Sequence, residues 1–212
     1  MINGVYKYTL SISHYRHYEK IGSETRDITE EIPFEIPNSW KWCRLRDICN
    51  IFGRIGFRGY TKNDIVSKGQ GAITISPSNI RKGRTVFDNN TYISWKKYYE
   101  SPEIMVYNND IILVKTGSSY GKSAIVSNLE EKATLNPQLV VLKYILCYGQ
   151  YLDSVLQSPF ATQQFENFVI GTAIPTFSQE KLSQLLVPLP PIKEQTRIIN
   201  QIKKLFDIVT SL

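Results

Sequence analysis

The chain has 212 residues, of which 42% are hydrophobic and 21% are charged, and its formal net charge is +6 at pH 7. This length and composition suit one folded domain with an appendage and exclude a largely disordered chain. No apolar run approaches the roughly 18 residues of a membrane-spanning helix, and residues 1–10 lack the apolar block of a signal peptide. We therefore expect a cytoplasmic protein without a membrane segment.

The positive charge is concentrated in one part of the sequence. Residues 41–84 hold ten Lys and Arg against two acidic residues, Asp47 and Asp64, which gives this block a net charge of +8. Residues 1–40 carry a net charge of −2, and the remainder balances. A basic block of this kind is typical of a surface that faces a polyanion, and a solvated basic face gives the same pattern.

The cysteines and histidines do not form a metal-binding pattern. Cys43, Cys49 and Cys147 are an odd number without a C-x-x-C pair, and His14 and His17 have no Cys or further His near them in the sequence. This spacing predicts buried, reduced thiols and indicates neither a zinc site nor a disulfide framework.

The pattern of apolar residues predicts short elements along the chain. Residues 1–36 are polar, acidic and rich in tyrosine, and we interpret them as a lead segment that is partly ordered at best. The stretch 45–52 is compatible with a short helix or a strand. Apolar runs bounded by turn residues predict strands at 72–75, 91–94, 111–114, 124–126, 139–145 and 185–189. Amphipathic patterns predict helices at 148–157 and 159–168.

Two polar loops lie in the basic block. The first, GRIGFRGYTKND, has glycines at positions 53, 56 and 59, which is not the dinucleotide-binding fingerprint. In a DNA-binding protein its candidate contacts are Arg54, Arg58, Tyr60 and Lys62; otherwise it is a surface hairpin. The second loop follows the strand at 72–75 and offers Ser76, Asn79, Arg81, Lys82 and Arg84, residue types suited to phosphates and to base edges and equally to an ordinary loop.

A third loop, KTGSSYGKS at 115–123, lies between two predicted strands. Three residues separate Gly117 from Gly121, whereas a phosphate-binding P-loop needs four, and no helix pattern follows Ser123. We therefore interpret the loop as the tip of a hairpin. Its candidate DNA contacts are Lys115, Ser118, Ser119, Tyr120 and Lys122. Further along, Thr134–Gln138 is expected to be a turn.

The chain ends in a predicted helix. Pro191 suits its first turn, and no Gly or Pro interrupts the sequence after it. Apolar residues then recur at spacings of four, three, four and three, at Ile198, Ile202, Leu205, Val209 and Leu212. This period of 3.5 favours pairing with a partner helix, although packing on the chain's own body is an alternative over so few turns.

Six stretches occur in order along roughly residues 18–205: EIPNSWKW, GYTKNDI, NDIILVKTGSSYGK, TLNPQL, GTAIPTFS and PLPPIKEQTRII. In amino-acid sequence, order and spacing these stretches resemble those of the DNA-sequence-specificity subunits of type I restriction-modification systems. The resemblance implies an α+β fold. A β-rich globular target recognition domain with short helices would occupy residues 37–190, and a coiled-coil-type spacer or dimerisation helix would occupy residues 191–212.

The resemblance also implies a function and partners. The chain would read one half of a bipartite double-stranded DNA target and dock the modification methyltransferase subunit, and the full complex would add a restriction subunit. With one recognition domain and one helix, the chain resembles half of such a subunit, and a homodimer through the last helix is one way to complete it. We expect the chain itself to be non-catalytic.

The expected cofactor lies on the partner. Asn136-Pro137-Gln138-Leu139 lacks the last two residues of the Asn-Pro-Pro-Tyr motif of such methyltransferases, and no other cofactor motif is present in the sequence. We expect no cofactor on this chain, and the resemblance implies that S-adenosylmethionine is bound by the methyltransferase subunit.

Two other functions are compatible with parts of the sequence. Asp110 and Glu130-Glu131-Lys132 supply the residue types of a magnesium-dependent endonuclease of the D…E-x-K kind, although the E-x-K part lies in a polar, turn-like stretch. A helix-mediated interaction module without DNA contact is the third hypothesis, and it leaves the basic block unexplained.

Overall fold

The computed structural model describes residues 16–54, 59–171 and 173–210. By its internal contacts the chain divides into two compact units, Met1–Trp40 and Lys41–Leu212, and each is described by itself.

The first unit contains an antiparallel hairpin of β1 (Tyr18–Ile21) and β2 (Glu24–Asp27), followed by a 3-10 turn at Thr29–Glu31. Gly22 allows the tight turn because it adopts a φ of +60°. Arg26 forms ion pairs with Glu19 at 3.3 Å and with Glu31 at 2.8 Å. Hydrogen bonds along the hairpin thus organise a stretch whose sequence shows little periodicity.

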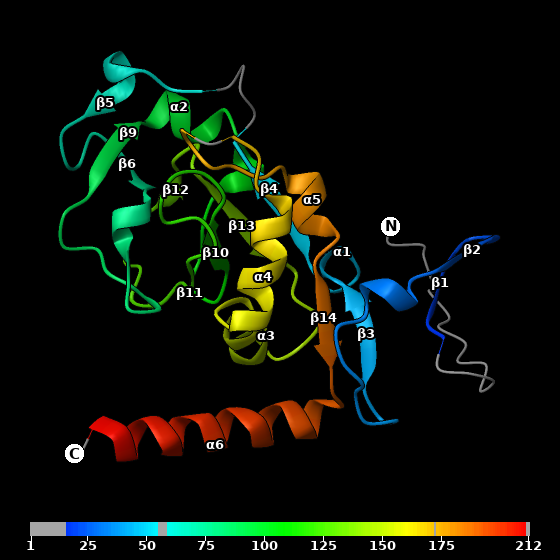
Figure 1. Cartoon of the computed structure of the whole chain (residues 1–212). Helices are drawn as coiled ribbons and strands as arrows, with labels where there is room; N and C mark the ends of the chain where they lie inside the picture. The colour runs from blue at the N-terminus through cyan, green and yellow to red at the C-terminus, as the bar shows by residue number, and fades with distance from the viewer. Residues whose placement is uncertain (1–15, 55–58, 172, 211–212) are drawn as a thin grey trace. The chain divides into compact units, whose positions relative to one another are not determined.

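The second unit is built on two four-stranded sheets (Figure 1). The first is antiparallel throughout, in the order β11 (Ser123–Ile125), β10 (Ile111–Val114), β13 (Leu139–Lys143) and β4 (Asn50–Gly53). The second has the order β12 (Ala133–Leu135), β6 (Gly71–Ile75), β9 (Thr91–Ser94) and β5 (Ile65–Val66), with β12 parallel to β6 and the other pairs antiparallel. Two short pairs are also present. They are β7 (Ile80–Arg81) with β8 (Arg84–Thr85), and β3 (Lys41–Arg44) with β14 (Leu186–Leu189).

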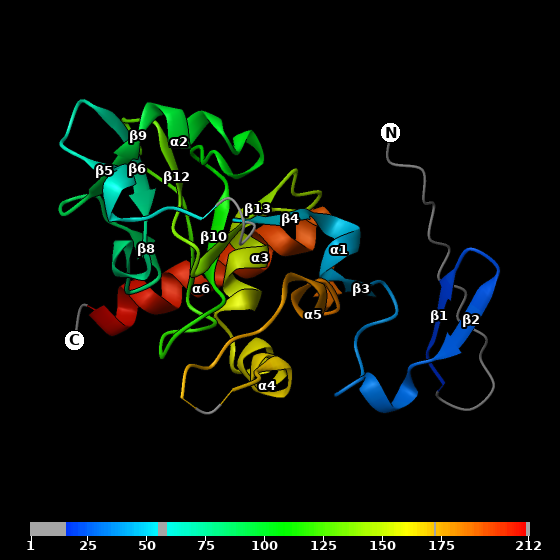
Figure 2. The ribbon, with the colours of Figure 1, turned by 90° about the horizontal axis from the view of Figure 1, so that it is seen from above.

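Strands β10 and β13 are apolar at almost every position because both of their faces are covered. Alternate side chains on a strand point to opposite faces. Ile111, Leu113, Val140 and Leu142 belong to one core, whereas Ile112, Val114, Leu139 and Val141 belong to the other. Figure 2 shows these strands between the helices on one side and the strands of the second sheet on the other.

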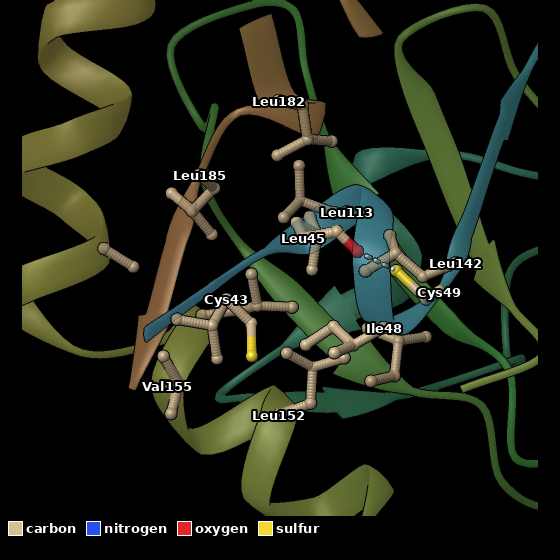
Figure 3. Packing of buried hydrophobic residues seen from close by; sticks show 14 of the residues in the cluster. Cys43, Leu45, Ile48, Cys49, Leu113, Leu142, Leu152, Val155, Leu182 and Leu185 are labelled. Atoms are coloured by element: carbon tan, nitrogen blue, oxygen red, sulfur yellow. Dashed lines mark hydrogen bonds between the residues drawn. The ribbon is translucent and has the colours of Figure 1, made fainter. Parts of the chain in front are cut away.

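The first core contains residues of several helices. These include α1 (Leu45–Ile48), α3 (Gly149–Leu156), α4 (Pro159–Phe168) and α5 (Gln179–Ser183), and part of the last helix also packs there. Figure 3 shows Leu45 and Ile48 facing Leu113, Leu142 and Leu152 in this core. Of the three cysteines predicted to be buried, Cys43 and Cys49 are buried in this core, whereas Cys147 is only partly buried against it. Burial raises the pKa of Cys43 to about 12, so its thiol stays protonated at neutral pH.

The last strand and the last helix are joined by a proline-rich turn. Strand β14 (Leu186–Leu189) pairs antiparallel with β3 (Lys41–Arg44), and α6 (Ile192–Thr210) follows directly. The buried Gln195 side chain accepts a hydrogen bond from Tyr148 N at 2.8 Å and donates one to Pro190 O at 2.7 Å. These two bonds fix the first turn of α6 against the body of the unit.

The predicted apolar seam of α6 divides into two parts. Ile199, which is not a residue of the predicted seam, is only 2% exposed in the first core, and the seam residues Ile198 and Ile202 pack partly buried against this core. Leu205 and Val209 are 62% and 67% exposed. The first half of the seam therefore packs on the chain's own body, as the alternative interpretation holds, and the described second half extends beyond it (Figure 1). Leu212 lies outside the described residues.

The α+β fold class is confirmed, and most predicted strands and helices are present. Residues 45–52 contain both alternatives, because α1 is followed by β4. The turn predicted at Thr134–Gln138 was wrong for its first two residues, which belong to β12. Helices α2 (Trp95–Tyr99) and α5 were not predicted. Among the residues that the structure describes, no helix is long and apolar enough to cross a membrane.

Candidate nucleic-acid interface

Two loops that are far apart in the sequence meet at one cleft of the second unit. The tip of the β7–β8 hairpin forms one wall, and the residues just before β11 form another. The end of α3 and one side of α4 complete the cleft, whose volume is about 520 Å³. Its polar lining combines three cationic side chains with an amide and three hydroxyls, those of Arg81, Lys82, Lys122, Gln157, Thr162, Tyr120 and Ser123.

The β7–β8 hairpin places Lys82 at its tip. Strands β7 (Ile80–Arg81) and β8 (Arg84–Thr85) are joined through Lys82 and Gly83, whose φ angles are +51° and +70°. Two successive residues with positive φ are typical of the tight turns that match the twist of a hairpin. Thr85 Oγ1 donates to Ser127 O at 3.1 Å and accepts from Ser127 N at 3.0 Å, so the hairpin is fastened to the chain just after β11.

The Arg81 side chain stabilises this hairpin. Its guanidinium donates two hydrogen bonds to the Asp88 carboxylate, at 2.6 and 2.8 Å, and a third to Ser78 O at 3.1 Å. These bonds from Arg81 hold the pKa of Asp88 below its usual range. Because Asp88 offsets the Arg81 charge, the exposed Lys82 and Arg84 are the better candidates for contact with an anion.

The loop at 115–123 is shaped by two glycines with positive φ, Gly117 and Gly121. A Cβ at position 121 would lie 2.9 Å from the Phe165 ring, so only glycine fits against α4 at this point. The Tyr120 ring packs edge-on against Phe177 and is half-buried. The Lys122 side chain is exposed at the rim of the cleft.

Arg54 and Asn79 do not reach the surface, which corrects the expectation that they contact DNA directly. Arg54 is 6% exposed, and its guanidinium donates to Leu135 O at 3.1 Å and to Thr134 Oγ1 at 3.2 Å. Asn79 is 2% exposed; its side chain accepts from Ser76 N at 2.9 Å and donates to Val86 O at 2.9 Å. Both side chains satisfy buried backbone groups of their neighbours, a structural task.

The other predicted contact residues lie outside the lining of the cleft. Tyr60 accepts a hydrogen bond from Asn136 at 3.0 Å, and Ser76 Oγ lies 2.8 Å from Ser78 Oγ. Burial lowers the pKa of the half-buried Lys115. Lys62 and Ser118 are exposed, and Ser119 is partly exposed. Arg58 lies outside the described residues.

Sequence reasoning missed Gln157, which follows the last residue of α3, and Thr162 of α4; both line the cleft. The amphipathic patterns at 148–157 and 159–168 indicate which side of each helix packs on the core. They do not indicate which other segments of the chain lie opposite its polar side. An aromatic surface was also not assigned: Trp95 and Tyr99 of α2 are 38% and 56% exposed. Lys132 Nζ lies 5.6 Å and 5.4 Å from the centres of these two rings. The sequence signal for this surface is the run WKKYY at 95–99.

Asp110, Glu131 and Lys132, named for the endonuclease hypothesis, are engaged with other partners, whereas Glu130 is exposed. Asp110 accepts hydrogen bonds from Lys143 Nζ and from Tyr107 N, and Glu131 accepts one from Tyr92. Lys132 donates to the Tyr99 hydroxyl. Within the described ranges, no three His, Cys, Asp or Glu side chains form a group that could hold a metal ion. The geometry lends this hypothesis no support.

The fold and the cleft thus define the second unit as an α+β domain with a cleft lined by cationic side chains and an amide. Residues 37–212 match the family model for the type I restriction modification DNA specificity domain, and the chain belongs to this family. The resemblance seen in the sequence is confirmed.

Individual relatives agree with this assignment. The specificity subunit of the type I restriction enzyme EcoAI from Escherichia coli is 25% identical over 197 residues, which is 86% of this chain and 31% of that protein. The crystal structure of the HsdS subunit from Thermoanaerobacter tengcongensis has a TM-score of 0.63 at 16% identity and covers 84% of this chain and 40% of its own. A chain from a structure on assembly of the type I R-M system has a TM-score of 0.64 at 17% identity, over 84% and 41% of the two chains. The chain thus spans less than half the length of each of these relatives.

Proposed function

We propose that this chain recognises a specific double-stranded DNA sequence for a type I restriction-modification complex, reading one half of a bipartite target. The observation that carries the proposal is the cleft at which Lys82, Lys122 and Gln157 are brought together from three separate segments. Membership of the DNA specificity domain family supports the same function. The endonuclease alternative has no observation in its favour.

The cleft supplies the two kinds of contact that DNA recognition requires. Lysine side chains at its rim neutralise phosphates, which gives affinity and fixes the position of the duplex. Amide and hydroxyl groups such as those of Gln157 and Thr162 read base edges in the major groove. A rigid sheet behind the loops holds both sets of groups in place.

The same proposal includes the partners. The chain docks the modification methyltransferase subunit, which binds S-adenosylmethionine and performs the chemistry, and the restriction subunit joins in the full complex. The chain itself is non-catalytic, binds no cofactor and acts in the cytoplasm, where the DNA is. Its family and the names of its relatives support the assignment to a type I restriction-modification complex.

The second half of α6 is proposed to pair with the same helix of a second copy. Leu205 and Val209 are mostly exposed and stand one turn apart on the helix. Pairing across a two-fold axis would bury both residues twice and set two recognition domains at a fixed separation.

Alanine substitution of the rim lysines tests the proposal for the cleft. For Lys82→Ala and for Lys122→Ala we expect weaker binding to all duplexes and a salt dependence of log K that is smaller by about 0.9 for each lost phosphate contact. Fluorescence anisotropy at several salt concentrations measures both quantities.

Lys41→Ala is the matched control. Lys41 belongs to the same basic block and is exposed, but it lies on β3 and does not line the cleft. Binding that is as strong in both cleft variants as in Lys41→Ala would place the DNA elsewhere.

A further inference from the structure

We infer that Gln157, oriented by the buried side chain of Asp153, reads a base edge of the target DNA. The inference rests on the proposed function and names a specificity-determining residue at the junction of α3 and α4, outside the loops from which the candidate contacts come. Three observations support it: the hydrogen bonds of the Gln157 amide, the exposure of its side chain and the residues around it.

The Asp153 side chain fixes the orientation of the Gln157 amide. The Asp153 side chain is buried, and its Oδ2 accepts a hydrogen bond from Gln157 Nε2 at 2.8 Å. Its Oδ1 accepts a hydrogen bond from Ser123 Oγ at 2.8 Å, and Ser123 begins β11. The carboxylate thereby ties the end of α3 to the sheet. The pKa of Asp153 is raised, because the effect of burial exceeds the opposite effect of the hydrogen bonds from Ser123 and Gln157.

The bond to Asp153 fixes which way the amide faces. With Nε2 directed at the carboxylate, Oε1 lies beside the hairpin tip, and a Cβ at position 83 would be only 2.6 Å from it. Gly83 therefore makes room for the amide. The Gln157 side chain is nonetheless exposed and lines the cleft, which leaves its Oε1 and its second N–H as the groups that it can offer to a ligand. One acceptor beside one donor complements the N6 and N7 atoms of adenine.

The backbone beneath Gln157 is also fixed. Gln157 N donates to Asp153 O at 3.0 Å at the end of α3, and Ser158 caps α4 by accepting from Ala161 N. Gln157 thus stands at the junction of two helices, between Lys82 on one wall and Lys122 on another. An amide held in this way loses little side-chain entropy when it binds a base, which favours selectivity.

Selection of duplexes from a random pool tests the inference. The pool is offered to the full chain together with a type I modification subunit, and the enriched sequences are compared between variants. For Gln157→Ala we expect the same motif with one or two adjacent positions relaxed, where discrimination falls by about 5- to 150-fold. Lys82→Ala is expected to lower recovery while leaving every position of the motif unchanged.

Variants of Asp153 separate orientation of the amide from a merely structural role. Asp153→Ala is expected to relax the same positions as Gln157→Ala. Asp153→Asn, whose side-chain oxygen can accept the same hydrogen bond, is expected to retain the preference. Gln163→Ala, an exposed glutamine of α4 outside the cleft lining, is the matched control and is expected to leave the motif unchanged.

The outcomes distinguish the inference from the proposed function. If the wild-type chain enriches no motif, the proposed function fails and the inference fails with it. If the wild type enriches a motif and Gln157→Ala preserves its preference at every position, the inference alone is overturned. Uniformly weaker recovery in Gln157→Ala, with all preferences intact, would make Gln157 a backbone contact and would also overturn it.

Discussion

At the scale of single residues, buried polar side chains shape the cleft and exposed ones are available to a ligand. Arg54 holds the carbonyl of Leu135 and Asn79 holds that of Val86, whereas Lys82 and Lys122 are exposed. Composition identified the loops, because Gly, Lys, Arg, Ser and Asn gather there. Composition could not separate the buried polar residues from the exposed ones, because the burial of Arg54 depends on β12, about 80 positions further along the chain.

Arg54→Ala is expected to weaken the fold rather than DNA reading. Removal of the guanidinium leaves Leu135 O buried without its hydrogen bond from Arg54, which costs about 1–3 kcal/mol of unfolding free energy. Urea denaturation measures the loss. Arg84→Ala, at the exposed position of β8, is the control and is expected to change stability by at most about 0.5 kcal/mol. Equal stability of the two variants would contradict the structural role of Arg54.

At the scale of elements, helix α6 belongs to two environments. Gln195 and Ile199 fasten its first half to the domain, and Leu205 and Val209 extend beyond that contact. The sequence predicts the helix and its apolar seam. The sequence does not predict which residue of α6 is the last to pack on the domain, because that depends on the position of α3 and on the turn at Pro190. Strands β10 and β13 were predicted because burial on both faces demands continuous apolar runs. The three-residue β12 is too short to show periodicity.

Substitutions in the two halves of α6 are expected to have different effects. Ile199→Ala opens a cavity in the first core and should cost about 2–4 kcal/mol of unfolding free energy. Leu205→Glu should leave unfolding unchanged and should abolish self-association at the helix. Urea denaturation measures the first effect, and sedimentation velocity over a range of concentrations measures the second. Wild-type chain that stays monomeric at all concentrations would contradict pairing between two copies.

At the scale of the whole molecule, two cores on opposite sides of one sheet hold three distant segments at one cleft. The hairpin at 80–85, the loop at 115–123 and the junction of α3 and α4 come together only because β10, β11 and β13 are paired in a defined register. Local patterns predicted most of these elements. The cleft depends on long-range pairing and on α4 packing against Gly121, which no local pattern contains.

The most direct test of the central claim is to compare the duplexes that a type I modification subunit recovers from a random pool with and without this chain. If the chain is a DNA specificity domain, its presence enriches one short sequence motif that the modification subunit alone does not enrich. Recovery of the same unselected sequences in both cases, with the chain folded and bound to the modification subunit, would contradict the claim.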